Sequence, residues 1–170
     1  MRVNRFDSIS QSYERAQGYL LQREAYHALI LGLIDAVSKS PNRFTHPPYF
    51  ATVEADETIL AVALQTPPRK LLLSQVVCPE AVEVIAFDFY QTQQLPLAGV
   101  IGPTIAAYTF AQTWDTLTGQ VYQKAMTQPF FPTRWNTVFP PSERTSATSN
   151  PCRATTIRKL VSGVDSRSFR

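Results

Sequence analysis

The sequence predicts an α+β domain in which helices pack on a small, mostly antiparallel sheet, followed by a disordered basic tail. Stretches with apolar residues three and four positions apart alternate with short β-rich runs, in an order that places two helices before a hairpin. The chain has 170 residues, of which 44% are hydrophobic, and this size fits one domain with a buried core.

Two helices are expected at the start of the chain. The first begins at Asp7 or Ser8, whose side-chain oxygen can accept from the free amides of the first turn, and ends at Gln17 before Gly18. The second covers residues 20–38, where apolar side chains recur at helical spacing and form one buried stripe. The stripe consists of Tyr26, Leu29, Ile30, Leu33, Ile34 and Val37.

Three β-rich runs follow the helices. Residues 49–54 and 58–65 are separated by a short polar segment, which is typical of an antiparallel hairpin. Residues 70–77 are short and nearly all apolar, as expected for a central strand that is buried on both faces.

The next helix is expected over residues 79–94. Pro79 lies where a helix tolerates proline best, in the first turn, and Glu80 and Glu83 lie near the positive end of the helix dipole. This helix is expected to bury Val82, Ile85, Ala86 and Phe89.

The remaining elements are a short strand within residues 95–101, a helix that opens at Pro103, and a strand over residues 120–126. The helix carries apolar residues at helical spacing and ends at Gly119, a natural left-handed stop.

The charge changes sign along the chain, and this change predicts two regions. Residues 1–126 hold nine Lys and Arg against eleven Asp and Glu, whereas residues 127–170 hold seven against two. The second region is rich in Arg, Ser, Thr and Pro and has no amphipathic period. It is interpreted either as a disordered basic tail or as the product of a reading-frame shift after Met126. Because the arginines are dispersed and lack interleaved aromatics, nucleic acid is not the expected partner.

No catalytic or cofactor-binding residue can be assigned from motifs, because the common glycine-rich phosphate loops and nucleophile elbows are absent. Glu24 and His27 have the spacing of one half of a di-iron site, but the second half is missing, and no metal is expected. Cys78 precedes a helix and is either a thiol of lowered pKa or a small apolar filler. The two cysteines lack a ligand spacing and the chain lacks a long apolar run. We therefore expect a cytoplasmic protein that does not enter a membrane.

Several segments together resemble the N-terminal half of a group of GCN5-related N-acetyltransferases (the GNAT family). They are residues 46–54, residues 59–74, Gly102-Pro103-Thr104 and residues 110–114. The likeness covers residues 5–126, so the resemblance suggests a truncated or frame-shifted acetyltransferase.

The resemblance implies transfer of an acetyl group from acetyl-CoA to the amine of a small molecule or a protein. In that family, two central strands diverge around the pantetheine, and backbone amides at a helix start hold the pyrophosphate. The family loop reads Arg/Gln-x-x-Gly-x-Gly/Ala, whereas residues 75–80 here read Gln-Val-Val-Cys-Pro-Glu. We therefore expect a chain that is inactive alone. The alternative is a non-enzymatic partner- or ligand-binding module of the same fold, in which an exposed strand edge could support a homodimer.

Overall fold

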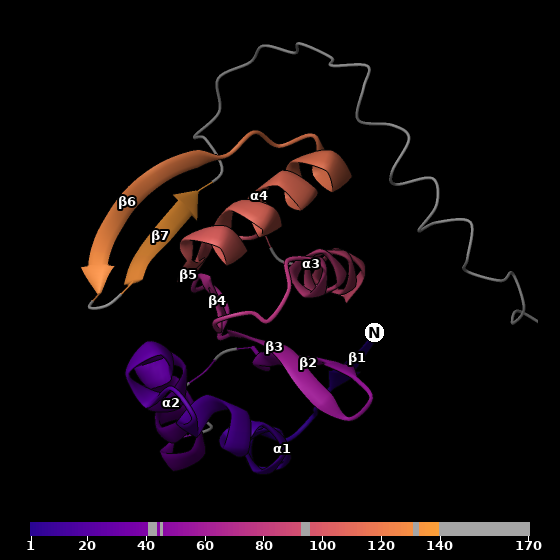
Figure 1. The fold of residues 1–170 in the computed structure, drawn as a ribbon, viewed down its shortest axis with the longest axis vertical. Coiled ribbons are helices and arrows are strands. Elements are labelled where there is room, and N and C mark those ends of the chain that lie inside the picture. Colours follow the sequence, from indigo (N-terminus) through magenta and orange to yellow (C-terminus); the bar gives the residue numbers. More distant parts are fainter. Residues whose placement is uncertain (41–43, 45, 93–95, 131–132, 140–170) are drawn as a thin grey trace, which may run out of the picture.

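The computed structural model describes residues 1–40, 44, 46–92, 96–130 and 133–139, and it has an α+β fold with one mixed sheet (Figure 1). The helices of these residues are α1 (Ile9–Leu21), α2 (Glu24–Lys39), α3 (Glu80–Thr92) and α4 (Thr104–Thr118). The strands are β1 (Arg2–Arg5), β2 (Tyr49–Ala55), β3 (Thr58–Gln65), β4 (Leu71–Leu73), β5 (Val100–Pro103), β6 (Gln123–Phe130) and β7 (Thr133–Phe139).

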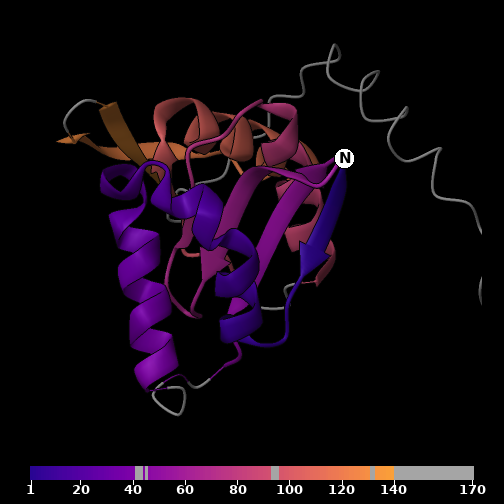
Figure 2. The same ribbon diagram turned by 60° about the horizontal axis from the view of Figure 1, so that its bottom comes forward.

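The strands form a seven-stranded sheet in the order β1-β2-β3-β4-β5-β7-β6. The pairing of β4 with β5 is parallel, and the other pairings are antiparallel. Helices α1 and α2 cover one face, and α3 and α4 cover the other (Figures 1 and 2). This arrangement confirms the predicted fold class as an α+β domain with a small sheet that is mostly antiparallel.

Helix α1 differs from its prediction at its C-terminal end. It continues through Gly18 to Leu21, and the side chain of Ser8 makes no capping hydrogen bond. A glycine inside a helix costs about 1 kcal/mol, but Ala16 and Leu20 on either side of it are fully buried and hold the turn in place. Leu20 therefore belongs to α1, and the second helix starts at Glu24 instead of residue 20.

The predicted hairpin is confirmed. Strands β2 and β3 are joined by a tight turn in which Asp56 and Glu57 have φ values of 49° and 63°. Such left-handed conformations at both central residues match the twist of the strands. The central strand is shorter than predicted, because β4 covers only Leu71–Leu73 of residues 70–77.

Helices α3 and α4 agree closely with the sequence prediction. Helix α3 begins directly after Pro79 and buries Val82, Ile85, Ala86 and Phe89 as expected. Helix α4 ends at Gly119, whose φ of 72° is left-handed and whose N–H donates to the Asp115 carbonyl at 2.7 Å. Glycine adopts this conformation without the steric penalty of a side chain.

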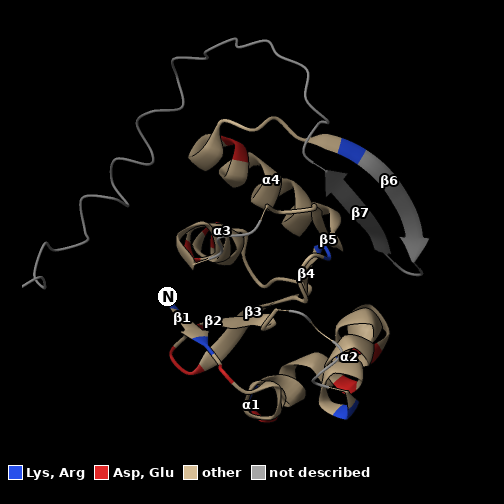
Figure 3. Ribbon diagram, turned by 180° about the vertical axis from the view of Figure 1, so that it is seen from behind, with Lys and Arg blue, Asp and Glu red and all other residues tan. Residues whose placement is uncertain are grey.

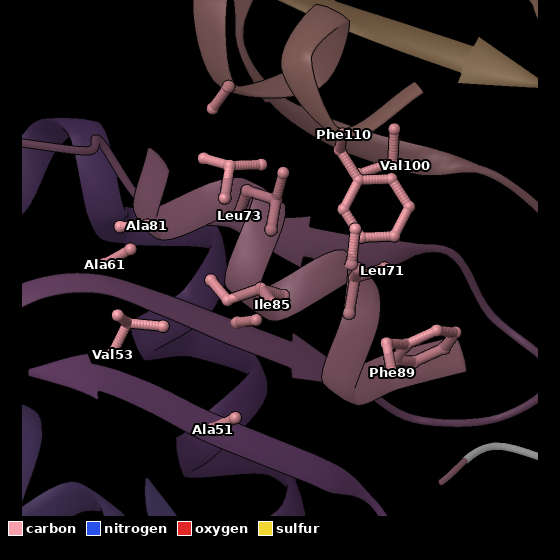
Figure 4. Close-up of a cluster of buried hydrophobic side chains, with 14 of the residues drawn as sticks. Ala51, Val53, Ala61, Leu71, Leu73, Ala81, Ile85, Phe89, Val100 and Phe110 are labelled. Carbon is pink, nitrogen blue, oxygen red and sulfur yellow. The ribbon is translucent and has the colours of Figure 1, made fainter. Parts of the chain in front are cut away.

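Two hydrophobic cores lie on the two faces of the sheet. The core under α3 and α4 contains the large rings of Phe89 and Phe110 together with small strand residues such as Ala51, Ala61 and Ala63. Figure 4 shows part of this core, with Phe110 beside Val100. Small side chains on the strands let the helices pack closely without voids. The core under α1 and α2 is formed by Ala16, Leu20, Ile30, Ile34, Phe50, Ile59, Val62, Leu64 and Leu72.

The sheet continues past Met126, where the sequence placed the domain boundary. Strand β6 runs to Phe130, and β7 inserts between β5 and β6 in antiparallel register with both. Residues 127–130 and 133–139 thus belong to the sheet, which corrects the prediction of a tail that starts at residue 127. The rest of the predicted tail, residues 140–170, lies outside the described residues.

No helix of the described residues is both long and apolar enough to cross a membrane.

Candidate functional site

The two central strands, β4 and β5, pair over a very short distance. Their parallel register consists of two pairs, Leu71 with Val100 and Leu72 with Ile101. A parallel pair in an otherwise antiparallel sheet lies where the chain crosses over through α3, and ligands of α/β proteins commonly bind at the carboxyl ends of such strands.

Beyond Leu73, the two chains follow different neighbours. The chain after β4 remains beside β3, because the N–H groups of Ser74 and Val77 donate to the carbonyls of Val62 and Leu60, each at 2.9 Å. Strand β5 continues beside β7, where Gly102 faces Asn136 and Pro103 faces Trp135. We call the region between residues 74–77 and residues 102–105, which lies beyond the last backbone pair of β4 and β5, the β4/β5 opening.

Gly102 follows the last residue of β5 that pairs with β4. A Cβ atom built on Gly102 would lie 2.9 Å from the Cβ of Leu73. Such a contact is too close for carbon atoms, so a side chain here would push β4 and β5 apart. Glycine at this position allows the two strands to touch just before they diverge.

A bulge shapes the β4 side of the opening. Ser74 and Val77 are three residues apart, but their partners Val62 and Leu60 on β3 are only two apart. The Ser74 hydroxyl also accepts from the Val62 N–H at 2.8 Å. One extra residue therefore lies between these contacts, which bends the strand and turns the peptide groups of Gln75 out of the ladder.

Two side chains from α1 and α2 bind the backbone of Gln75. Nε2 of His27 accepts from the Gln75 N–H at 3.2 Å, and the Tyr19 hydroxyl donates to the Gln75 carbonyl. The other ring nitrogen of His27, Nδ1, donates to the Leu20 carbonyl at 2.8 Å, and the ring stacks on Tyr19 with centroids 5.5 Å apart. We call Tyr19, His27, Ser74 and Gln75 the His27 network.

Burial keeps both titratable members of the network neutral. Desolvation lowers the pKa of His27, and the positive charge of Arg23 lowers it further, whereas the hydrogen bond to the Leu20 carbonyl raises it. Desolvation raises the pKa of the Tyr19 hydroxyl, against smaller opposing effects of Ser74 and Arg23. A neutral imidazole with a proton on Nδ1 is therefore the form that matches the observed contacts.

The start of α3 lies beyond the bulge, directly after Cys78 and Pro79. Pro79 has no N–H, and the amides of Ala81 and Val82 already donate to the carbonyls of Cys78 and Pro79 at 3.3 and 2.8 Å. Glu80 and Glu83 place two carboxylates in the first turn of the helix (Figure 3). These features leave few free donors for an anion and add negative charge beside it.

The structure does not bring Glu24 and His27 into one metal site. His27 is 2% exposed with both ring nitrogens hydrogen-bonded, whereas Glu24 is exposed in the first turn of α2. Within the described residues, no group of three or more His, Cys, Asp or Glu is placed to hold a metal ion. Cys78 is a partly exposed free thiol at the end of the bulged segment.

Sequence reasoning found His27 only as half of a metal motif, and it missed the network altogether. Gln75 lies 48 residues after His27 and 56 after Tyr19, so no local pattern connects them. The only available signal was a histidine within the apolar stripe of a helix, because a buried imidazole needs polar partners.

A second polar cluster lies beside the edge strand β1. Arg15 of α1 donates to both carboxylate oxygens of Glu54, at 3.1 and 2.6 Å, and Thr52 donates to the same carboxylate at 2.8 Å. Burial would raise the pKa of Glu54, but hydrogen bonds from Arg15, Thr52 and Asn4 outweigh it and lower the pKa. Arg15, Glu54 and Asn4 line an open hollow of about 510 Å³ together with Arg2, Phe6 and Glu57.

No family model, no curated protein and no solved structure matches this chain.

Proposed function

We propose that this chain is an acetyltransferase-like domain that does not transfer acetyl groups on its own. The observation that carries the proposal is the β4/β5 opening. Strands β4 and β5 pair at two positions only and then diverge, with a bulge on one side and the start of α4 on the other. This is the arrangement that the sequence resemblance implies for a pantetheine held between two central strands.

The start of α3 supports the absence of activity. A pyrophosphate needs several free N–H groups and close approach of the backbone, which glycine permits. Here Cys78, Pro79 and Glu80 occupy these positions, and Gln75, the one residue that fits the family loop, has its side-chain oxygen bound to Arg23 at 2.9 Å. The carboxylates of Glu80 and Glu83 would also repel the phosphates.

Restoring the loop tests this proposal. The triple variant Cys78→Gly, Pro79→Ser, Glu80→Gly recreates the family spacing after Gln75. A matched control, Cys78→Ser, Pro79→Ser, Glu80→Gln, removes the proline and the charge but supplies no glycine. Binding of CoA and acetyl-CoA is measured by calorimetry, and thiol release with a panel of amines reports acetyl transfer.

We expect the natural chain and the control to bind CoA more weakly than about 1 mM, and the glycine variant to bind at least about tenfold more tightly than the control. Turnover of acetyl-CoA by the natural chain would contradict the absence of activity. A folded glycine variant that binds no better than the control would contradict the assignment of the opening to a CoA-type ligand.

Exposed apolar residues favour a second candidate function, the binding of an apolar ligand or peptide segment without chemistry. Val77 on one side of the opening is 66% exposed, and Ile105 in the first turn of α4 is 64% exposed. An apolar fluorescent dye would probe this function. We expect Val77→Asp with Ile105→Asp to abolish dye binding, whereas Leu21→Asp, at an exposed apolar position of α1, should leave it unchanged.

A further inference from the structure

His27 connects the α1–α2 pair to the segment that forms the β4 side of the opening. Its Nδ1 is bound to the Leu20 carbonyl at the end of α1, while its Nε2 is bound to the Gln75 N–H in the bulge. The residue itself lies in the first turns of α2. One buried imidazole of α2 thus connects the end of α1, seven residues away in the sequence, with the bulge, 48 residues away.

We propose that His27 is a positioning residue that clamps the bulged segment 74–77 in its neutral form and releases it when the imidazole is protonated. A neutral ring has one donor and one acceptor, and the two observed contacts use one of each. Protonation turns Nε2 into a donor that faces the donor N–H of Gln75. The contact is then repulsive, and the Gln75 amide has to turn toward another acceptor.

The groups around the ring do not stabilise the positive charge that protonation of His27 adds. The titratable and charged groups that face His27 are Tyr19 of α1 and Arg23 of the turn before α2, while the sheet contributes the uncharged Gln75. Arg23 repels an imidazolium, and the Tyr19 hydroxyl already donates to the Gln75 carbonyl. Among the described residues, the groups that face His27 include no carboxylate, so none of them can compensate a positive charge on its ring.

Release of the clamp affects the opening directly. Gln75 lies within the bulge, and Ser74 and Val77 bind β3 on either side of it. Loss of the His27 contact frees the Gln75 N–H. The Gln75 carbonyl is still bound by Tyr19, its side chain by Arg23, and the flanking residues by β3. The inference that release of Gln75 alters a ligand site rests on the proposed function. The clamp itself is inferred only from the hydrogen bonds of His27.

Nuclear magnetic resonance of the full chain tests the clamp without any ligand. Imidazole nitrogen shifts of His27 and the exposed His46, together with the amide shift of Gln75, are followed from pH 8 to pH 5. We expect His27 to titrate below its ordinary value of 6.5 with Nδ1 protonated in the neutral form, and the Gln75 amide to shift with the midpoint of His27. A Gln75 amide that does not follow His27 would overturn the proposal.

Hydrogen exchange of two variants completes the test. His27→Gln places an amide oxygen near the position of Nε2, so it accepts from Gln75 without titrating, and His46→Gln is the matched control. In the natural chain and in His46→Gln, protection of the Gln75 amide should fall about fivefold to tenfold once His27 is protonated. In His27→Gln it should stay constant over the same range. An equal fall in all three chains, or none in the natural chain, would reject the clamp.

These readouts use no CoA, so they separate failure of the clamp from failure of the proposed function.

Discussion

Helices α3 and α4 cover their face of the sheet with a mainly apolar core, at the edge of which Asp88 accepts from the Tyr49 hydroxyl at 2.8 Å. Helices α1 and α2 cover theirs with an apolar core that includes several buried polar contacts. On the α3–α4 face, Phe89 packs edge-on against Tyr49, Phe110 and Trp114, with ring centroids 5.0 to 6.4 Å apart. On the α1–α2 face, the buried residues include His27 and Ser12, and the Arg15–Glu54 pair lies at the edge.

The difference separates two kinds of stabilisation. Apolar packing is non-directional and independent of protonation, so the apolar core of the α3–α4 face should respond to lost volume and not to pH. Hydrogen bonds and ion pairs are directional and depend on protonation, so the α1–α2 face should respond to pH as well. The β4/β5 opening borders both faces. The side chain of Val76 packs on the α3–α4 core, whereas the hydrogen bonds of Tyr19 and His27 to the backbone of Gln75 come from the α1–α2 face.

The largest effect is expected for Phe89→Ala. The ring is 1% exposed at the centre of the α3–α4 core, and its removal leaves a cavity that closely packed neighbours cannot fill (Figure 4). We expect a loss of about 3–5 kcal/mol in the free energy of unfolding, measured by urea denaturation at pH 7 and pH 5. The loss should be the same at both pH values. A strong pH dependence would contradict the assignment of the Phe89 contribution to apolar packing.

A smaller but clear destabilisation is expected for Arg15→Met. The variant leaves the Glu54 carboxylate, whose side chain is 5% exposed, with Thr52 but without its cation. Because folding lowers the pKa of Glu54, the pair stabilises the protein above the ordinary value of 4.5, and this contribution disappears as the pH falls through the folded-state pKa. The urea midpoints of variant and natural chain should therefore converge in acid.

Lys39→Met is the control, because it breaks the exposed Lys39–Asp35 pair of α2. Its urea midpoint should be nearly unchanged at every pH. A change in the urea midpoint as large as that of Arg15→Met would show that the exposed pair stabilises the protein as much as the partly buried Arg15–Glu54 pair.

An intermediate, pH-dependent effect is expected for His27→Gln. Folding lowers the pKa of His27, so the unfolded chain takes up a proton first as the pH falls below 6.5, and stability decreases in this range. One such group contributes a slope of at most about 1.4 kcal/mol per pH unit. His27→Gln should flatten the stability profile between pH 6.5 and pH 5, whereas an unchanged slope would locate the titration elsewhere.

The smallest effects are expected at two helical glycines, with opposite signs. Gly18 lies exposed inside α1 with open space around its α-carbon, so Gly18→Ala should raise the free energy of unfolding by about 0.5–1 kcal/mol. Gly119→Ala should lower it by about 1 kcal/mol, because alanine is strained at a φ of 72°. Thermal unfolding of both variants measures the difference, and changes of the same sign would contradict this assignment of their roles.

Local patterns predicted the elements that depend on neighbouring residues. The hairpin of β2 and β3 follows from two β-rich runs around a polar turn, and α4 follows from its apolar spacing and Gly119. Helix α1 was predicted to stop at Gly18, because the local preference of glycine was visible and the burial of Leu20 was not.

The C-terminal hairpin shows the reverse error. The composition after Met126 suggested a tail, yet β7 pairs with β5 and β6 on its two sides. A strand is stabilised mainly by the neighbours with which it pairs, so a composition that is poor in local signals can still form a central strand.

The sequence by itself determined the fold class, the hairpin of β2 and β3 and the absence of a glycine loop before α3, because these features depend on side-chain type and spacing along the chain. Only the tertiary structure decided where β4 and β5 diverge and which side chains hold the bulge. His27 and Gln75 meet across 48 residues through one hydrogen bond. Such a contact depends on the packing of α2 against the sheet. Packing between distant segments produces no periodic pattern in the sequence from which the contact could be predicted.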